Sequence, residues 1–358
     1  MRAKKKYGFD PEYAVPPGET LRETMTSLQM TQKELADRLG LTVQTLNRIF
    51  EGVQPITYET ANRLELVTGI PARLWNNLEM QFQEDKSKLE EKKRFESDVN
   101  WLKTIPVKEL VSRGLVENDN VKSLLLRSVL AFYGVSSVGA WGEIWINPSV
   151  AARRSTCFET QPGSASAWIR QGELKALDME YEPYDRKKFQ IALSNIRGLT
   201  NNEPEDFISK MQNLCAKSGV ALVFVRDMKK VPWNGATKWL SPDKAMIILS
   251  LRGKFEDKFW FSFFHEAGHV LNGSKKRLYI AGNSSDPDEK EADRFAADFL
   301  IPEKFNDRIR NCSSKADIIR IANELDIAPG IVAGRYQFLT KQYDFFKGLI
   351  RKCDWVED

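Results

Sequence analysis

Apolar and polar positions alternate with two different periods along the chain. Apolar residues recur at helical spacing within residues 31–50, 121–133 and 187–196, so these segments predict amphipathic helices. Two unbroken apolar runs, residues 219–225 and 245–251, are rich in β-branched side chains and bounded by breakers, which is typical of buried strands. The pattern predicts an α+β protein in three parts: an all-α domain over residues 1–82, a helical connector over residues 83–165, and an α+β domain over residues 166–358.

Residues 30–52 carry the signals of two short helices joined by a tight turn. Thr31 followed by Glu34 predicts a capping box for the first helix, Gly40 ends that helix, and Thr42 caps the second. The side chains expected to face inward are apolar: Leu35, Ala36, Leu39, Leu46 and Ile49. Two helices across a glycine turn form a helix-turn-helix, whose second helix enters the major groove of DNA.

The outer side of this helix pair carries the candidate DNA contacts. The residues expected at base edges are Val43, Gln44 and Asn47, and those expected near phosphates are Gln32, Thr45 and Arg48. Residues 1–80 hold ten Lys or Arg against ten Asp or Glu, so the domain lacks the strong basic footprint of many DNA binders. Binding to operator DNA is therefore expected to depend on a basic face, the Lys4–Lys6 arm and assembly as a homodimer.

The chain has two histidines among its 358 residues, and both lie in one five-residue window, His265 to His269. Residues i and i+4 share a helix face, so both imidazoles can reach one metal ion while Glu266 leans over a metal-bound water. This is the HExxH arrangement of zinc-dependent peptidases. Apolar residues flank the motif and Gly273 ends the segment, so we expect a buried helix.

A zinc site of this class takes a third protein ligand, and no further histidine exists to supply it. A second predicted helix begins near Asp286, and Glu289 lies beside its apolar stripe. Glu289 is the favoured third ligand and Glu291 is its rival. Asp293 is placed to hold the outer N–H of a ligating imidazole. The competing interpretation is that Glu289 closes a capping box with Asp286.

The residue types define a hydrolytic mechanism with Zn²⁺ as the cofactor. Zinc acidifies its bound water and polarises the peptide carbonyl, while Glu266 takes the water's proton and passes it to the leaving amine. The oxyanion is stabilised by Tyr279, by Arg294 or by zinc alone, and the sequence does not rank them. Residues 233–239 predict either an edge strand that holds an extended substrate or a plain hairpin with core tryptophans.

Residues from about 168 to 336 resemble the ImmA/IrrE family of zinc metallopeptidases, and the match is carried by the HExxH window together with other short stretches. These stretches are residues 167–170, 219–225, 235–236, 247–252 and 259–261, Glu289-x-x-Ala292-x-x-Phe295-Ala296, and residues 300–302. The resemblance implies a zincin-like fold with a gluzincin-like site in which Glu266 polarises the water. It also implies that the protein substrates are DNA-binding repressors, which are cut once to release them from operators.

Residues 18 to about 82 resemble the HigA-type antitoxins of the phage-repressor (XRE) helix-turn-helix class. The match continues through residues 55–57 and 74–78. Two functions follow as hypotheses. The first is a regulator with a tethered endopeptidase that cleaves a repressor, an antitoxin or itself, in a stress response. The second is an antitoxin and autorepressor, with or without a cognate toxin, whose C-terminal part is a metal-stabilised sensor with little proteolysis. The presence of Glu266 favours the first, because a metal-only site needs no base.

Composition adds little to this picture. The net charge of +4 does not identify a partner, and no run approaches 18 consecutive apolar residues, so no membrane span is expected. The four cysteines are far apart in sequence, which predicts free thiols in a reducing cytoplasm. The charge run Glu84–Arg94 predicts a solvated helical connector, and residues 321–330 predict two packed helices of the C-terminal domain.

Overall fold

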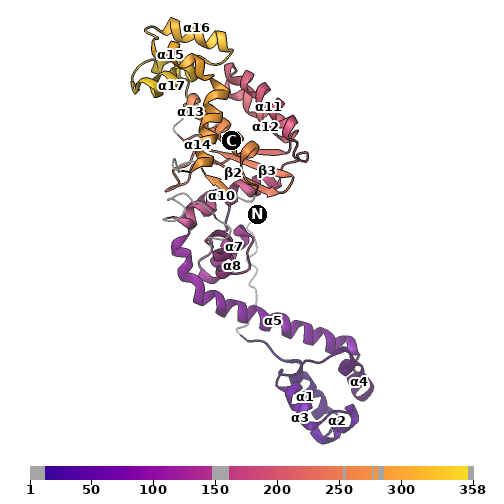
Figure 1. Cartoon of the computed structure of the whole chain (residues 1–358). Coiled ribbons are helices and arrows are strands. Elements are labelled where there is room, and N and C mark those ends of the chain that lie inside the picture. The colour runs from indigo at the N-terminus through magenta and orange to yellow at the C-terminus, as the bar shows by residue number, and fades with distance from the viewer. Residues whose placement is uncertain (1–12, 147–160, 253–254, 276–277, 281–285, 354–358) are drawn as a thin grey trace, which may run out of the picture. The chain divides into compact units, whose positions relative to one another are not determined.

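A computed structural model describes residues 13–146, 161–252, 255–275, 278–280 and 286–353. The chain forms two compact units, one of residues 1–99 with 121–126 and one of residues 100–120 with 127–358. The first unit is helical, and the second combines helices with a four-stranded sheet, which confirms the predicted α+β class (Figure 1). The domain boundaries drawn from the sequence stay predictions.

The described residues of the first unit up to residue 98 form five helices. They are α1 Pro17–Ser27, α2 Gln32–Leu39, α3 Val43–Phe50, α4 Tyr58–Thr68 and α5 Ala72–Asp98. Thr31 and Thr42 accept the backbone N–H three residues on, and Gly40 ends α2 with φ of 65°, as predicted. The carboxylate of Glu34 accepts from Arg38 at 2.8 Å, so Thr31 and Glu34 form only half of the expected capping box.

The core of this unit contains all of the side chains predicted to face inward in α2 and α3, each at most 2% exposed. Helix α1 approaches α3 closely at Gly18, where a Cβ would lie 2.4 Å from the Cα of Phe50. The charge run Glu84–Arg94 lies inside the long helix α5, and Lys88 pairs with Glu84 at 2.7 Å across one helical turn. The connector predicted from that run is therefore continuous helix.

Further helices lie between residues 99 and 349 of the described chain. They are η1 Val99–Thr104, α6 Val107–Ser112, α7 Lys122–Tyr133, α8 Val138–Trp145, α10 Pro162–Leu177, α11 Arg186–Gly198, η2 Leu199–Asn201, α12 Pro204–Ala216, α13 Glu256–Asn272, α14 Pro287–Leu300, η3 Glu303–Phe305, α15 Asn306–Arg310, α16 Lys315–Leu325, α17 Pro329–Thr340 and η4 Lys347–Leu349. Helices α7, α11, α13 and α14 confirm four helices read from the sequence, and the packed pair α16 and α17 confirms the reading of residues 321–330.

The sheet has the strand order β1-β3-β2-β4. Its strands are β1 Val220–Phe224, β2 Gly235–Ser241, β3 Lys244–Leu249 and β4 Leu278–Ile280. Strand β1 runs parallel to β3, whereas β2 is antiparallel to both β3 and β4. The expectation of an edge strand at residues 233–239 is wrong, because the short strand β4 covers β2 and itself forms that edge of the described sheet.

Both faces of the sheet are covered, which explains the unbroken apolar runs of β1 and β3. On one face, Ile247 packs in a core with α11, α12 and α13. On the other face, Ile248 meets α10 at Gly172, where a Cβ would lie 2.4 Å from the Ile248 side chain. Alternation along β2 turns Gly235 and Thr237 toward the α13 face, since they pair with Leu249 and Ile247.

The segment Lys122–Trp145 is long and apolar enough to cross a membrane by length and composition, which the sequence reading did not anticipate. It is two helices in the structure, because Gly134 adopts φ of 68° between α7 and α8. Its aromatic side chains are buried and pack edge to face, with the rings of Trp101 and Trp141 5.1 Å apart. The hydroxyl of Tyr133 donates to the carbonyl of Gly163 on α10 at 3.1 Å. These contacts are those of a core helix pair.

At Gly163, α10 lies directly against the backbone of Thr104. A Cβ there would lie 2.0 Å from the carbonyl oxygen of Thr104. Relieving this clash would require a shift of the backbone, which costs more free energy than rotating a side chain. We expect Gly163→Ala to destabilise the second unit by about 1–3 kcal/mol. Gly142→Ala is the matched control, since nothing lies within 4 Å of its Cβ position, and it should change stability by no more than about 1 kcal/mol. Thermal melts of both variants check this, and equal melting temperatures would contradict the packing at Gly163.

Candidate metal centre and DNA-binding face

Helix α13 brings both histidines onto one face. Just before the HExxH segment, the helix carries three fully buried aromatic side chains, Trp260, Phe263 and Phe264. These side chains fix the HExxH segment in the core. His265 and His269 are 5% and 1% exposed, and their Nε2 atoms lie 3.1 Å apart. One turn of a buried helix therefore points two imidazole nitrogens at a common position.

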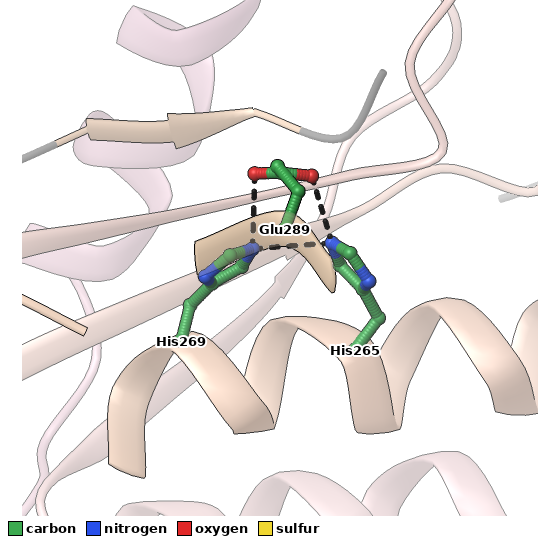
Figure 2. A group of neighbouring side chains, drawn as sticks. All are labelled: His265, His269 and Glu289. Carbon is green, nitrogen blue, oxygen red and sulfur yellow. Dashed lines mark hydrogen bonds and ion pairs between the residues drawn. The ribbon is translucent and has the colours of Figure 1, made fainter. Parts of the chain in front are cut away.

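Helix α14 supplies the third group. The carboxylate of Glu289 lies between the two rings, with Oε2 3.3 Å from Nε2 of His265 and Oε1 3.2 Å from Nε2 of His269 (Figure 2). The side chain of Asp286 caps α14 by accepting from the N–H of Asp288 at 3.1 Å. Glu289 thus faces the histidines, whereas Glu291 is exposed and lies outside this group.

The spacing of the three groups suits a single small cation. Ligand atoms about 2.0–2.1 Å from one tetrahedral metal ion are separated by about 3.3 Å. The observed separations of 3.1, 3.2 and 3.3 Å agree with that value. Among the described residues, His265, His269 and Glu289 form the one cluster of three such ligands within mutual reach.

The electrostatics of the cluster favour one bound positive charge. Burial lowers the pKa of His265, but its hydrogen bonds with Asp293 and Glu289 outweigh burial and raise that pKa to about 10. Burial also raises the pKa of Glu289, while the two histidines lower it to about 2. The carboxylate therefore stays ionised and needs a cation beside it, either a proton on an imidazole or a metal ion.

Two further side chains orient the imidazoles. Asp293 Oδ1 lies 2.8 Å from Nδ1 of His265. A carboxylate only accepts, so Nδ1–H donates to it, and Nε2, which faces Glu289, is the nitrogen that would bind a metal ion after losing its proton. The ring of Tyr279 on β4 stacks on His269 with 4.2 Å between centroids and 15° between planes. Both histidines are thus held in the orientation that a metal ligand needs.

Glu266 lies beside the cluster in a fully buried position. Its Oε2 accepts from the hydroxyl of Thr237 at 2.7 Å, and its Oε1 has no hydrogen-bond partner among the described residues. Gly235 on β2 makes room for this carboxylate, because a Cβ there would lie 2.6 Å from Oε1. Burial raises the pKa of Glu266. The roles of Thr237 and Gly235 were missed in the sequence, where an isolated glycine in a strand was the available signal.

The two residues considered for oxyanion stabilisation differ in availability. The hydroxyl of Tyr279 accepts from the N–H of Ser274 at 2.6 Å and donates to Asp288 at 3.3 Å. Those bonds occupy the group. Arg294 is exposed on α14, one residue after Asp293. The geometry therefore argues against Tyr279 and leaves Arg294 or the metal ion itself.

The predicted DNA-contact residues lie on the first unit's α2 and α3. Val43, Gln44, Asn47 and Arg48 are exposed on α3. The amide of Gln32 donates to the side chain of Asn47, which ties α2 to α3. The hydroxyl of Thr45 lies 2.9 Å from that of Thr42, so it belongs to the helix cap. The Lys4–Lys6 arm lies outside the described residues. The DNA contacts of all these residues stay predictions.

Two family models match the chain. Residues 21–75 match a helix-turn-helix family, and residues 222–330 match the IrrE N-terminal-like domain of the M78 peptidases. The second match begins in β1, contains α13 and α14, and ends at the start of α17. Comparison with curated proteins gave no match, and comparison with solved structures gave none. The chain therefore combines an N-terminal helix-turn-helix domain with a C-terminal peptidase-family domain, and both resemblances seen in the motifs are confirmed at this level.

The cluster makes a direct prediction for metal binding. Zn²⁺ added to metal-free protein should bind at about one equivalent per chain and raise the melting temperature, because an ion that binds only the folded state stabilises it by about 2.7 kcal/mol at a hundredfold excess over Kd. His265→Ala, His269→Ala and Glu289→Ala should each abolish this rise, and Asp293→Asn should weaken affinity by about 10–100-fold.

Glu291→Ala is the matched control for the third ligand, because it removes an exposed carboxylate from the same helix. Calorimetric titration and thermal melts measure both effects. Loss of zinc binding in Glu291→Ala with retention in Glu289→Ala would overturn the ligand assignment, and failure of the wild type to bind zinc would overturn the site.

Proposed function

From the premise that this chain joins a helix-turn-helix domain to an IrrE N-terminal-like peptidase domain, we propose that it is a DNA-binding regulator with a tethered zinc endopeptidase. One observation carries the proposal. The Nε2 atoms of His265 and His269 converge with the Glu289 carboxylate, and a buried Glu266 lies next to them in the chain. Ligands and base together are what peptide hydrolysis requires.

The chain's own residues account for the proton transfers. Zinc, when bound, supplies Lewis-acid polarisation of the scissile carbonyl and acidifies a water. Glu266 accepts the proton of the attacking water at Oε1, which no described residue occupies, and later delivers it to the leaving amine. Thr237 keeps the other oxygen fixed, so the carboxylate does not rotate between steps. Asp293 maintains the His265 tautomer that leaves Nε2 free to act as a ligand.

The substrate follows from the tether. A peptidase attached to an operator-binding domain meets regulators bound at that operator at high effective concentration, so even a slow enzyme acts on them selectively. We propose a helix-turn-helix repressor or antitoxin as the substrate. Self-cleavage in Glu84–Arg94 loses support, because this segment is helical within α5 and a zincin cleft takes extended chain. The cytoplasm and a stress response are the setting that such a regulator implies.

The competing function is an antitoxin-like autorepressor whose C-terminal domain is stabilised by metal but does not hydrolyse peptides. A purely structural metal site gains nothing from a buried carboxylate that lacks a partner for one oxygen, since such a group costs about 1–3 kcal/mol. Glu266 therefore favours hydrolysis. A cognate toxin and a homodimer remain parts of this proposal to be tested.

Glu266→Gln separates the two functions. The change should preserve zinc binding and lower peptide cleavage by about 10²–10⁴-fold, the contribution of a general base. Gly235→Ala should lower cleavage as well, because the added methyl group meets the Glu266 carboxylate. Wild type and variants are expressed beside an operator reporter, and fragments of helix-turn-helix proteins are followed by mass spectrometry under DNA damage and oxidative stress.

Glu291→Gln is the control that removes an exposed carboxylate near the site without touching Glu266. It should cleave like the wild type. Identical fragments and identical reporter output from wild type and Glu266→Gln would remove the peptidase function and leave the autorepressor.

The DNA-binding half is tested by base-edge and phosphate variants. A dimer should bind an inverted repeat near its own gene, with half-sites about one helical turn (~34 Å) apart or a multiple of it. Gln44→Ala and Asn47→Ala should each lose about 1–3 kcal/mol of discrimination per bidentate base contact. Arg48→Ala should weaken binding to all sequences alike and flatten the salt dependence.

Asn62→Ala, an exposed asparagine on α4, is the control for Asn47→Ala and should leave binding unchanged. Gel-shift titrations over a salt range measure these effects. Equal affinity of the wild type for operator and random DNA at every salt concentration would contradict sequence-specific recognition.

A further inference from the structure

A deep cleft of about 980 Å³ opens on the second unit between α13, α14 and α17. It is lined by residues that lie far apart in the sequence, from Asn234 before β2 to Lys352 near the C-terminus. This volume is in the range of pockets that take a small ligand or several side chains of a peptide. The cleft was not visible in any sequence motif.

The cleft adjoins the metal centre through side chains that contact its ligands. Asp293 lines the cleft and also holds Nδ1 of His265 at 2.8 Å. Phe261 lines it as well, and its ring centroid lies 6.3 Å from that of His265. On the far side, Asn234 directly precedes Gly235, which packs on Glu266. The cleft is therefore lined by residues that contact His265 or directly precede the strand residue beside Glu266.

Large apolar side chains at the cleft are left partly uncovered. Phe338 on α17 and Tyr343 after it are 60% and 58% exposed, and Phe261 is 37% exposed. The deeper wall is apolar too, since Ile331 is only 5% exposed. Exposed aromatic groups around an apolar cavity mark a binding surface for a bulky apolar side chain.

The charges around the cleft are mostly positive. Its lining has five basic residues, Lys258, Arg294, Arg335, Lys347 and Lys352, and two acidic ones, Asp257 and Asp293. Asp293 is engaged by His265. No carboxylate among the described residues pairs with Lys258, Arg294 or Lys352. The cleft therefore complements an acidic ligand.

We propose that this cleft is the substrate-recognition site of the peptidase domain, a proposal that rests on the proposed function. It selects extended peptide segments in which a bulky apolar residue beside the scissile bond is followed within a few residues by Asp or Glu. The apolar residue enters between Phe261, Phe338 and Ile331, and the acidic residues meet the basic rim. Basic segments, such as the DNA-facing surfaces of repressors, are disfavoured.

Part of this selectivity belongs to this chain rather than to the matched family domain. The family match ends at residue 330, whereas Ile331, Phe338, Tyr343 and Lys352 all lie beyond it. The C-terminal segment is anchored to α13 by Arg351, whose guanidinium donates to Glu256 at 2.7 Å. Residues after 330 are thus held where they complete the cleft.

Peptide binding to Glu266→Gln tests the proposal without interference from hydrolysis. Three fluorescein-labelled unstructured peptides differ only in their central residues, Leu-Glu-Asp, Leu-Lys-Lys or Ser-Glu-Asp. Anisotropy at low salt should show the first binding about tenfold tighter than either other peptide, and added salt should shrink the difference between the two charged Leu peptides.

The measurement is made on both zinc-loaded and metal-stripped protein, because a peptide carboxylate could ligate zinc directly. A preference that persists without zinc supports the cleft. A preference that vanishes on stripping assigns it to metal ligation and overturns the proposal.

Variants at the exposed rim localise the effect. Lys258→Glu with Arg294→Glu should reverse the preference toward the Lys peptide, and Phe338→Ala should weaken both Leu peptides about threefold or more. The matched controls are Lys210→Glu and Ile191→Ala, exposed positions outside the cleft, which should bind like the parent protein. Unchanged selectivity in the rim variants, with native melting curves, would overturn the proposal.

The two proposals fail separately. Cleavage by the wild type without acidic or apolar preference leaves the peptidase standing and removes the cleft assignment. Selective binding with no cleavage of any peptide or regulator supports the cleft assignment and contradicts the proposed peptidase function.

Discussion

The second unit is organised around the need to compensate three ionisable side chains on one buried turn of α13. His265, Glu266 and His269 are each at most 5% exposed, and uncompensated burial of such groups costs several kcal/mol. Two elements supply polar groups that offset this free-energy cost. Helix α14 brings a carboxylate to the imidazoles, and strand β2 brings the Thr237 hydroxyl to Glu266. The tight packing of α13 against α14 and the inner place of β2 follow from this requirement.

Much of the fold and of the site was predictable because the deciding signals are local. Caps at Thr31 and Thr42 and the i, i+4 spacing of the histidines act within one or two helical turns. Glu289 was predicted by its place on the apolar stripe of the next helix. The strand order was not predictable, because it depends on the three-residue strand β4. The cleft was not predictable either, since its walls come together only in the folded chain.

The cores of the two units differ in the polarity of their buried side chains, and this difference bears on how metal binding would change the stability of each unit. The helix-turn-helix core is apolar throughout, and its helix ends are satisfied by threonine and glycine caps. It requires no ion. The second unit encloses an ionised carboxylate beside two imidazoles, and this carboxylate is stabilised by a positive charge beside it, either a proton on an imidazole or a metal ion. A metal ion bound by His265, His269 and Glu289 would therefore stabilise the second unit.

At Glu266, burial of a carboxylate lowers the stability of the fold, whereas the proposed hydrolysis needs that carboxylate as a base. Its Oε2 is satisfied by Thr237, but its Oε1 is buried with no partner among the described side chains. An apolar residue of similar size would remove this cost of about 1–3 kcal/mol. The neighbouring strand instead has a glycine at residue 235, whose missing Cβ leaves room for the carboxylate. An unsatisfied buried acceptor with space cleared around it calls for an explanation, and the proposed general-base role of Glu266 supplies one.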